Sequence, residues 1–442
     1  MSGKRLFVIS VDALFSEDLE YAATRKHLGP WLEHASGCEC TKSIYPTVTY
    51  PNHVSMMTGC YADRHGIYTN YMFSTDGDGH SHWYWDGRYI KVDTIFTAAK
   101  RAGYTTACGF WPVTCNLKDI DWNMPEYWLS HDGDTVENFF PANGANEQVM
   151  EIALANKWRL RPGVVKNIDC QPEYDDWIVG IDCDIIRKYK PEVYLTHWSI
   201  VDTFRHKFGI DHPKHFEAID HVDEWFGKIC DALKEAGVYE DTDIVITSDH
   251  GQMDCERLSK VNAFLADKGL ITLDENGKVV DYVGMIVSDG MCASVYLKNP
   301  DSEADKKLVY DTLKEMADIG IYGISEVLTK EYVQEHEHMD GPFSFVIETD
   351  GYTSYMDGFV PPYVVRNDKT ATKDHRYGRG SHGFLPHKGP RPMFRCAGPH
   401  IVPDVILPEH CVVDEAPTYA ALLGAELPEA QGKPMTELLK LD

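Results

Sequence analysis

The sequence is poor in long apolar runs and in positive charge. No uninterrupted apolar stretch approaches the roughly 20 residues that a membrane-spanning helix needs, so we expect no membrane partner. The chain has 42 Lys and Arg residues against 69 Asp and Glu residues, for a formal net charge of -27. Affinity for long nucleic acids depends on cationic side chains that neutralise phosphates, so we expect no such partner. A small phosphorylated substrate is compatible with this negative charge, because a bound metal ion can make the electrostatic potential at a site locally positive.

The sequence also lacks clustered cysteines and an export signal. Its 12 cysteines are scattered, and the one close pair, Cys38 and Cys40, has no second Cys or His pair at zinc-finger spacing. Scattered cysteines are typical of free thiols in a reducing compartment. The first residues lead directly into the apolar segment 6–11, which is too short for a signal sequence and its cleavage site. We therefore expect a cytoplasmic protein.

The sequence does contain a regular alternation of apolar strand patterns and helical patterns. This alternation predicts an α/β fold, with a mostly parallel sheet that carries helices on both faces. We expect core strands over 6–11, 105–111, 192–198, 243–247 and 392–397. We expect helices over 16–34 (interrupted by Pro30), 51–58, 92–102, 175–190, 215–235 and 416–423.

The pattern changes character after Gly251. Helices are expected over 258–268 and 302–319, and strands over 278–287, 291–297 and 343–348. This mixture predicts a smaller α+β lobe, residues 255–373, inserted into a core formed by residues 1–254 and 374–442. The polar segment 368–380 is expected to return the chain to the core, and the lobe is expected to shape the substrate pocket.

Seven side chains suited to metal binding or nucleophilic attack follow the predicted core elements. They are Asp12, Thr49, Asp202, His206, Asp249, His250 and His382. Each lies where a predicted strand gives way to a loop or helix, which is where open α/β sheets place their ligand sites. Three carboxylates, three imidazoles and one hydroxyl suit two divalent cations and a nucleophile.

Two of these residues also fit a structural role when each is taken alone. Asp12 after a strand has the pattern of a helix N-cap. Thr49 precedes Pro51 at the mouth of a predicted helix, where it could also be an N-cap. The unpaired N–H groups of a helix N-terminus suit a phosphoryl group, however, and a metal on the threonine oxygen would favour its alkoxide.

The other segments are more specific. Asp202 and His206 are four residues apart, so they can share one face of a helical turn, as metal ligands or as a surface ion pair. Asp249 and His250 follow a buried strand, and burying both costs free energy unless they are paired or metal-bound. His382 lies in a Gly-Ser-His-Gly run whose glycines permit the close turn of a ligand loop.

Together these segments match, in order, the motifs of a known family. The matching runs are 46–53 around Thr49, Thr58-Gly59, 64–67 (Arg-His-Gly-Ile), Asn70, 202–209 (Asp-x-x-x-His-Lys-x-Gly), 248–251 (Ser-Asp-His-Gly) and 381–383 (Ser-His-Gly). Over almost its whole length the chain resembles the nucleotide pyrophosphatase/phosphodiesterase family of the alkaline phosphatase superfamily. This resemblance implies an alkaline phosphatase-like fold and a metal-dependent phosphoric (di)ester hydrolase.

The resemblance also implies a role for each site residue. Thr49 would be the nucleophile, forming a phosphothreonine, and Asn70 with the backbone N–H of Tyr50 would stabilise a phosphoryl oxygen. The Tyr50 ring would stack on a nucleobase. From the residues themselves, Tyr50 and Trp111 could form an aromatic slot for a base, with core packing as the alternative role of these rings. Two metals are implied, with Zn2+ expected and Mn2+ as the alternative. The first would be surrounded by Asp12, Thr49, Asp249 and His250, and the second by Asp202, His206 and His382.

Several functions stay open at this point. The preferred one is a two-metal phosphodiesterase or nucleotide pyrophosphatase-like hydrolase acting on a small phosphodiester or nucleotide, a cyclic dinucleotide included. A phosphonoacetate hydrolase would instead cleave a C–P bond, and Lys42, Lys118 or Lys388 could bind the substrate carboxylate. The non-enzymatic alternative is a catalytically inactive metal- or nucleotide-binding protein. Neither the exact substrate nor the oligomeric state can be inferred from these motifs.

Overall fold

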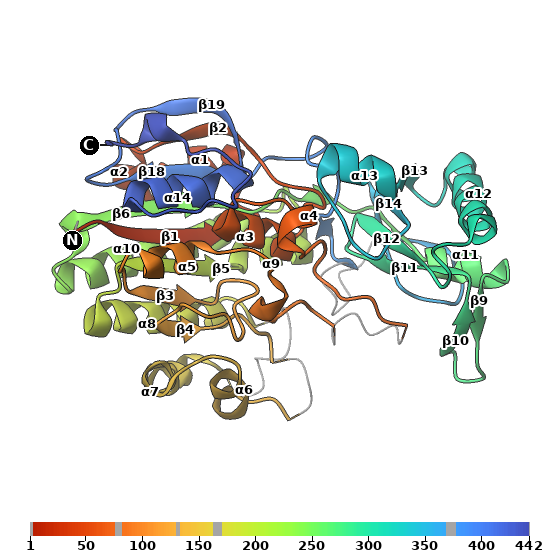
Figure 1. Cartoon of the computed structure of the whole chain (residues 1–442), viewed down its shortest axis with the longest axis horizontal. Helices are drawn as coiled ribbons and strands as arrows, with labels where there is room; N and C mark the ends of the chain where they lie inside the picture. Colours follow the sequence, from red (N-terminus) through yellow and green to blue (C-terminus); the bar gives the residue numbers. More distant parts are fainter. Residues whose placement is uncertain (1–2, 76–81, 130–132, 162–169, 368–376, 442) are drawn as a thin grey trace.

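The computed structural model describes residues 3–75, 82–129, 133–161, 170–367 and 377–441. The molecule is elongated, with a large core at the end that holds both termini and a smaller lobe at the other end (Figure 1). No helix in these described ranges is both long and apolar enough to cross a bilayer.

The core is built on one eight-stranded sheet. In spatial order its strands are β19 (Ile406–Cys411), β2 (Ser36–Lys42), β18 (Phe394–Ala397), β6 (Thr242–Thr247), β1 (Arg5–Val11), β5 (Val193–Trp198), β3 (Thr106–Gly109) and β4 (Trp122–Met124). Every pair is parallel except the two pairs that β18 makes, with β2 and β6. This order confirms the predicted mostly parallel α/β sheet.

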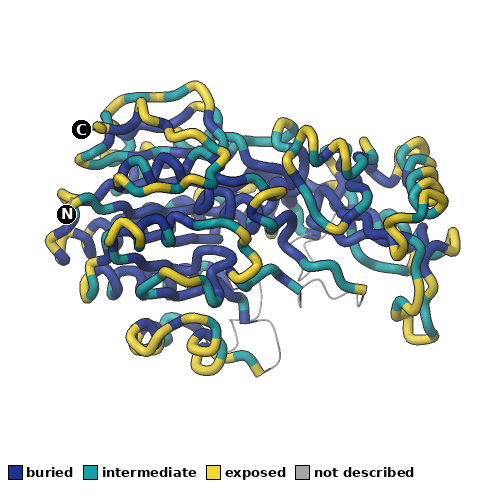
Figure 2. The backbone as a smooth tube through the Cα atoms, viewed as in Figure 1, coloured by how far each residue is buried: buried dark blue, intermediate teal, exposed yellow. Residues whose placement is uncertain are grey.

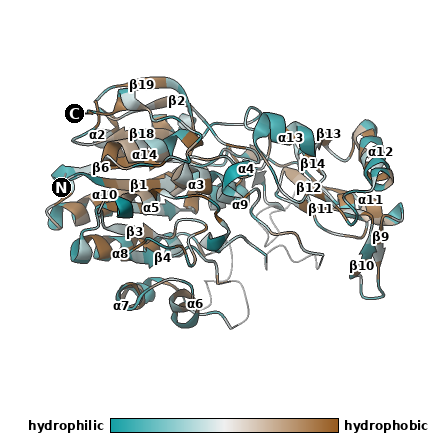
Figure 3. Cartoon of the chain, viewed as in Figure 1, coloured by the Kyte–Doolittle hydropathy of each residue, from teal (hydrophilic) through white to brown (hydrophobic). Residues whose placement is uncertain are grey.

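Helices cover both faces of this sheet, as predicted (Figure 1). One face packs against α3 (Thr49–Thr58), α5 (Ile95–Arg101) and α14 (Glu415–Leu423). The other packs against α7 (Glu147–Asn156), α8 (Glu173–Tyr189) and α10 (Lys214–Glu235). Successive side chains of β1 point to opposite faces of the sheet. Leu6 and Val8 pack on the face that α3, α5 and α14 cover, and Phe7 and Ile9 pack on the face that α7, α8 and α10 cover. The central strands β1, β5, β6 and β3 are accordingly buried, whereas the edge strand β19 is largely exposed (Figure 2). Figure 3 shows β1 as mostly hydrophobic.

The remaining core helices are short. They are α4 (Ala62–His65), α6 (Val136–Ala142), α9 (Ile200–Phe208) and the 3-10 turns η3 (Gly87–Tyr89), η4 (Lys157–Arg159), η7 (Tyr239–Asp241), η9 (Val412–Asp414) and η10 (Thr436–Leu438).

The single helix expected over 16–34 is wrong. The segment forms η1 (Ser16–Asp18), α1 (Leu19–Ala22) and α2 (Leu28–Leu32). The break precedes α2, where the Asp223 carboxylate accepts the backbone N–H groups of His27 and Leu28. Pro30 lies in the first turn of α2, where a missing N–H group is tolerated, so it does not interrupt the helix.

The lobe contains a separate antiparallel sheet in the order β11 (Gly284–Ser288), β12 (Cys292–Leu297), β14 (Phe345–Thr349) and β13 (Ile324–Thr329). Three helices accompany it: α11 (Val261–Asp267), α12 (Glu303–Ile319) and α13 (Lys330–Glu337). Smaller sheets are formed by β9 (Ile271–Leu273) with β10 (Val279–Tyr282), and by β8 (Arg257–Ser259) with β15 (Thr353–Tyr355) and β16 (Val364–Arg366). The lobe's exposed edge is formed by α12 and the β9–β10 hairpin (Figure 2).

The lobe differs in detail from the expected elements. The helix over 258–268 begins only at Val261, because 257–259 is strand β8. The strand over 278–287 is two strands in different sheets, and β13 and α13 were not predicted. Most of the expected return segment lies in 368–376, outside the described residues. Where described, β7 (Met253–Asp254) and β17 (Gly380–Ser381) pair side by side as the two connections to the core. The boundaries at 255 and 373 stay a prediction.

Helix α9 begins at a buried carboxylate. Oδ2 of Asp175, on α8, accepts the backbone N–H groups of Ser199 and Ile200 at 2.8 Å each. These are donors that the first turn of a helix leaves without an intrahelical partner. Asp175 therefore anchors the helix that carries Asp202 and His206.

Replacing this carboxylate should destabilise the protein. We expect Asp175→Ala to lower the free energy of unfolding by about 1–3 kcal/mol, because two buried N–H groups lose their acceptor. Urea unfolding followed by tryptophan fluorescence measures the change. Asp211→Ala, at an exposed position, is the matched control and should leave the midpoint unchanged. Equal midpoints for the two variants would contradict the anchoring role.

Candidate metal and nucleophile site

The seven predicted residues meet at one edge of the core sheet. Asp12 follows β1, Asp249 and His250 follow β6, and Asp202 and His206 lie on α9, just beyond β5. Strands β6, β1 and β5 are parallel neighbours, so their carboxyl ends lie together. Thr49 begins α3, and His382 follows β17 at the end of the described lobe connection.

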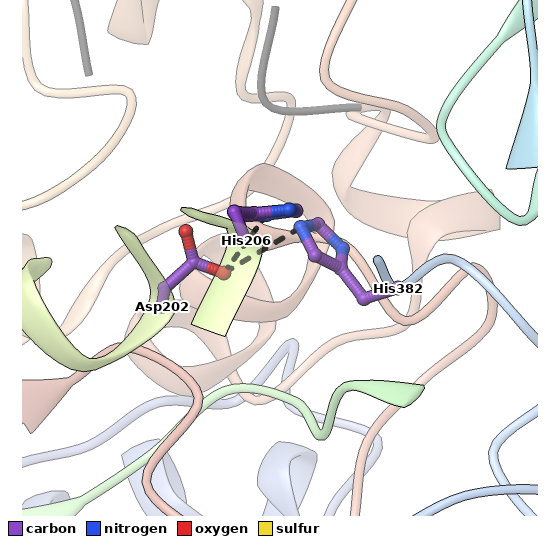
Figure 4. Close-up of side chains that lie close together, drawn as sticks. All are labelled: Asp202, His206 and His382. Atoms are coloured by element: carbon purple, nitrogen blue, oxygen red, sulfur yellow. Dashed lines mark ion pairs between the residues drawn. The ribbon is translucent and has the colours of Figure 1, made fainter. Parts of the chain in front are cut away.

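One group of possible metal ligands is Asp202, His206 and His382, whose ligand atoms all lie within 4.8 Å of one another. Oδ1 of Asp202 lies 3.2 Å from His206 Nε2 and 3.7 Å from His382 Nε2. Figure 4 shows both imidazoles converging on this carboxylate. Asp202 and His206 therefore lie together as possible metal ligands in a buried site, and the surface ion pair is excluded.

A second group is Asp12, Asp202 and His250, within the same 4.8 Å limit. Nε2 of His250 lies 3.3 Å from Asp12 Oδ1 and 3.3 Å from Asp249 Oδ2. Asp202 thus belongs to both groups and lies between them. The sequence had assigned it to one metal alone.

Each of the three imidazoles is oriented by a backbone carbonyl. Nδ1 of His206 donates to Gly380 O at 2.7 Å, Nδ1 of His382 to Thr47 O at 3.0 Å, and Nδ1 of His250 to Gly251 O at 3.2 Å. A proton on Nδ1 leaves Nε2 as a lone-pair donor facing the carboxylates. This is the arrangement that metal-ligating histidines use.

The buried carboxylates of the site repel one another, and this repulsion shifts their pKa values. Burial raises the pKa of Asp12 well above its ordinary value, and repulsion from Asp249 and Asp202 raises it further. Burial, with repulsion from Asp202, raises the pKa of Asp249 to about 8. Burial alone would raise the pKa of Asp202 too, but the neighbouring imidazoles, led by His206, lower it below its ordinary value.

The donor set fits a divalent cation. Oδ1 of Asp12 and Oδ2 of Asp249 are buried and have no hydrogen-bond partner among the described residues. A buried carboxylate oxygen without a partner costs free energy unless a cation or a proton compensates it. Mixed carboxylate oxygens and imidazole nitrogens are the ligands that zinc and similar metals take.

Thr49 is the first residue of α3 and not its N-cap, which is Val48. Its Oγ1 lies 3.3 Å from His250 Nε2, and its carbonyl accepts a hydrogen bond from His53 Nδ1 at 2.8 Å. The threonine hydroxyl therefore faces the metal-ligand groups from a helix N-terminus. The N-cap alternative for Thr49 is wrong.

Asn70 lies beside the same helix N-terminus. Its Oδ1 accepts the backbone N–H of Tyr50 at 2.9 Å. In this structure the Tyr50 N–H is thus held by Asn70, whereas the sequence had placed both donors on a phosphoryl oxygen. The contact fixes the Asn70 amide with its oxygen toward α3.

The predicted aromatic slot is wrong for this structure. Tyr50 is 1% exposed and Trp111 is 0% exposed, so neither presents a face on which a nucleobase could stack. The Tyr50 hydroxyl donates to Glu126 Oε2 at 2.5 Å, and its ring packs against Trp83 and Trp85. The two tryptophans cover the Tyr50 ring, and the bond to Glu126 holds its hydroxyl in the interior, so the core-packing alternative is confirmed.

Two of the lysines expected for a phosphonoacetate carboxylate are engaged in ion pairs, and the third is exposed. Nζ of Lys388 lies 3.1 Å from a carboxylate oxygen of Glu348 and donates to Thr349 O at 2.9 Å. Lys42 pairs with Glu409 at 2.5 Å on an exposed edge of the sheet. Lys118 is exposed. None of these contacts favours the C–P alternative.

Two residues that contact the metal-ligand carboxylates were not predicted from the sequence. Gln252 donates its amide to Asp202 Oδ1 and, at 3.2 Å, to the Asp202 carbonyl. Nε2 of His197 lies 3.4 Å from Asp12 Oδ2. Gln252 directly follows the Asp249-His250-Gly run, so its place next to a ligand motif could have indicated its role. His197 lies inside β5, and nothing in its sequence context indicates that it reaches Asp12.

Known proteins resemble this chain over most of its length. The family model described as type I phosphodiesterase / nucleotide pyrophosphatase matches residues 6–384. Bis(5'-adenosyl)-triphosphatase enpp4 of Xenopus laevis is 24% identical over 285 residues, which cover 62% of this chain and 53% of that protein. Ectonucleotide pyrophosphatase/phosphodiesterase family member 5 of Homo sapiens is 24% identical over 300 residues, which cover 66% of this chain and 54% of that protein. The match thus spans about half the length of these curated relatives.

Solved structures share the fold. Murine ectonucleotide pyrophosphatase/phosphodiesterase 5 aligns with a TM-score of 0.70 at 19% identity, covering 99% of this chain and 100% of that one. An inactive variant of the same murine protein in complex with AMP aligns with a TM-score of 0.69, also at 19% identity and with the same coverage. At this identity the likeness establishes the fold alone.

The fold and the site define an alkaline phosphatase-like α/β protein with metal-ligand groups at the carboxyl edge of its sheet. The family match runs from β1 to the residues that follow His382. The chain belongs to the type I phosphodiesterase / nucleotide pyrophosphatase family, which confirms the predicted resemblance.

The raised carboxyl pKa values predict how the metal-free protein responds to pH. Because the pKa of Asp249 is raised to about 8, the folded state holds a proton that the unfolded chain releases near pH 4. The metal-free protein should therefore lose stability as pH rises from about 5 to about 8. Added Zn2+ should raise the unfolding temperature more at the higher pH, and thermal scans with chelator or zinc measure this.

Asp249→Asn is the control, because the amide cannot ionise. It should flatten the pH dependence of the metal-free protein. An equal pH dependence in the wild type with chelator, the wild type with zinc and this variant would contradict the electrostatic account of the site.

Proposed function

We propose that the protein is a metal-dependent phosphodiesterase of the nucleotide pyrophosphatase type, with Thr49 as its nucleophile. One observation carries the proposal. Thr49 Oγ1 lies at the N-terminus of α3, 3.3 Å from His250 Nε2, beside two groups of metal ligands that share Asp202. Membership of the type I phosphodiesterase / nucleotide pyrophosphatase family supports the same chemistry.

The metals that we propose are two divalent cations, Zn2+ first and Mn2+ second. One would be held by Asp12, Thr49, Asp249 and His250, and the other by Asp202, His206 and His382. The shared position of Asp202 lets its carboxylate serve both. When bound, such cations would favour the Thr49 alkoxide and neutralise charge on the phosphoryl oxygens.

The chain's own residues then perform a two-step displacement. Thr49 Oγ1 loses its proton to solvent and bonds to phosphorus while the bond from phosphorus to the leaving oxygen breaks, which forms a phosphothreonine and releases the leaving group, which takes a proton from solvent where it needs one. Water then attacks phosphorus, the bond to Oγ1 breaks, and the threonine hydroxyl is restored. The N-terminus of α3 favours the negative phosphoryl group. Asn70 accepts the Tyr50 N–H through Oδ1, which leaves its Nδ2 as the donor that we propose for a phosphoryl oxygen.

The substrate that we propose is a small nucleotide diester or pyrophosphate. The Xenopus relative is named a bis(5'-adenosyl)-triphosphatase, and the murine variant was solved with AMP. Base stacking on Tyr50 or Trp111 is not part of the proposal, because both rings are buried. A screen of nucleotide diesters, dinucleotide polyphosphates, cyclic dinucleotides, phosphonoacetate and monoesters, each with zinc and manganese, tests the substrate. Preferential turnover of phosphonoacetate would overturn it.

The location that we propose is the cytoplasm. The support is that all twelve cysteines are free thiols, ten of them buried. Cell fractionation of the untagged protein tests this, and recovery from the secreted fraction would refute it.

The nucleophile assignment predicts a sharp loss of activity. Thr49→Ala should lower the kcat for bis-p-nitrophenyl phosphate more than about a thousandfold, because alanine lacks the oxygen that attacks phosphorus. Bound zinc, measured by elemental analysis, should stay near the wild-type level because the carboxylates and imidazoles remain. Thr49→Ser, which keeps a hydroxyl, is the matched control and should retain measurable turnover. Full activity in Thr49→Ala would rule out this nucleophile.

A further inference from the structure

A buried carboxylate joins the lobe to the two loops that carry the nucleophile and His382. Glu348 lies on β14 of the lobe sheet and is 0% exposed. It does not belong to either group of metal ligands, and the proposed displacement does not use it. Its three hydrogen-bond donors come from outside the lobe sheet.

Two of these donors lie in the loops of the site. The Tyr45 hydroxyl, four residues before Thr49, donates to Glu348 Oε2 at 3.0 Å. The Leu385 backbone N–H, three residues after His382, donates to Glu348 Oε1 at 3.0 Å. One rigidly placed carboxylate on a strand therefore holds both loops at once.

The same two loops are also tied directly to each other, through Thr47. Its carbonyl accepts Nδ1 of His382 at 3.0 Å, and its Oγ1 accepts the Gly383 N–H at 3.1 Å and donates to Phe384 O at 2.8 Å. Any shift of one loop is thus transmitted to the imidazole of His382. Glu348 contacts both loops from the lobe, and the Met291 N–H adds a second lobe contact by donating to His382 O at 2.7 Å.

The third donor balances the charge of Glu348. Nζ of Lys388 lies 3.1 Å from Glu348 Oε1 and is itself held by Ser325 Oγ at 3.1 Å and Thr349 O at 2.9 Å. Burial raises the pKa of Glu348 to about 7, although Lys388 and the Leu385 N–H oppose this rise. The ammonium is committed to this contact and is not directed at a substrate.

We propose that Glu348 is a positioning residue for the phosphodiesterase site, which sets the His382 imidazole relative to Thr49 by holding Tyr45 and Leu385. It touches neither the substrate nor the metal ligands, so it acts only through these two loops. The inference rests on the proposed function for its kinetic readout. It also predicts a change in zinc affinity and in hydrogen exchange at the Leu385 amide, and neither measurement requires phosphodiesterase activity.

The test compares two substitutions of Glu348 in the whole chain of 442 residues. Glu348→Ala removes all three contacts, so kcat should fall about 10- to 100-fold, as for groups that orient metal ligands, and the affinity of one zinc site should fall about tenfold. KM should change less than about threefold, because ground-state binding is not altered. Faster hydrogen exchange at the Leu385 amide is the metal-independent readout.

Glu348→Gln distinguishes position from charge. Its Oε1 can still accept from Leu385 and Lys388, and its Nε2 can donate to the Tyr45 hydroxyl oxygen. We therefore expect kcat, zinc affinity and Leu385 exchange within about threefold of the wild type. A Gln variant as impaired as the Ala variant would mean that the charge of Glu348 matters, which overturns the proposal.

Two further variants keep the test decisive. Glu326→Ala, at the exposed register partner of Glu348 on β13, is the matched control and should leave all three readouts unchanged. If Glu348→Ala does not fold, Tyr45→Phe, which removes one donor alone, should still lower kcat severalfold. Wild-type kcat, zinc affinity and Leu385 exchange in Glu348→Ala, or wild-type kcat in Tyr45→Phe, would refute the positioning role.

The two proposals fail in different ways. If the wild type hydrolyses no phosphodiester, the proposed function fails, and zinc titration with Leu385 exchange still decides the role of Glu348. If the wild type is active and Glu348→Ala matches it in every readout, the positioning role alone fails.

Discussion

The structure depends on the crowding of three buried carboxylates at one edge of its sheet. Asp12, Asp202 and Asp249 lie around the Nε2 atoms of three imidazoles, and two of their oxygens have no hydrogen-bond partner among the described residues. Such a cluster repels itself and resists ionisation, as the raised pKa values of Asp12 and Asp249 show. Divalent cations would offset this repulsion, so the groups that repel one another are the groups that would bind metal.

The surroundings of the cluster are organised to keep it in place. Each imidazole is fixed by a backbone carbonyl, Asp202 is held by Gln252, and α9 is anchored through its first turn. The lobe takes part as well, because a Glu348 oxygen and the Met291 N–H reach the His382 loop. A ligand cluster on strand ends would be flexible if its loops were free. Core and lobe together remove that freedom, which links the packing of a remote sheet to the geometry of the site.

The apolar pattern of short segments was enough to predict the central strands of the sheet. Strands β1, β5 and β6 are mostly apolar segments of a parallel sheet, and they are buried on both faces. The segment 16–34 failed because its break depends on Asp223, which is distant in sequence. Tyr50 failed for a similar reason: its exposure depends on Trp83 and Trp85 packing over it, and no feature of the nucleophile segment reveals that.

The sequence by itself determined which chemical groups the site contains and their order along the chain, because the ligand residues lie in short motifs, and those of Asp12 and of Asp249 with His250 directly follow a mostly apolar strand. It also determined the family, since those runs occur together and in order. Only the tertiary structure decided which atoms meet. That Asp202 lies between both ligand groups, that Asn70 holds the Tyr50 N–H, and that Glu348 reaches two loops from the lobe all follow from contacts between distant segments. Sheet order and the placement of the lobe set those contacts, and neither is encoded in any one segment.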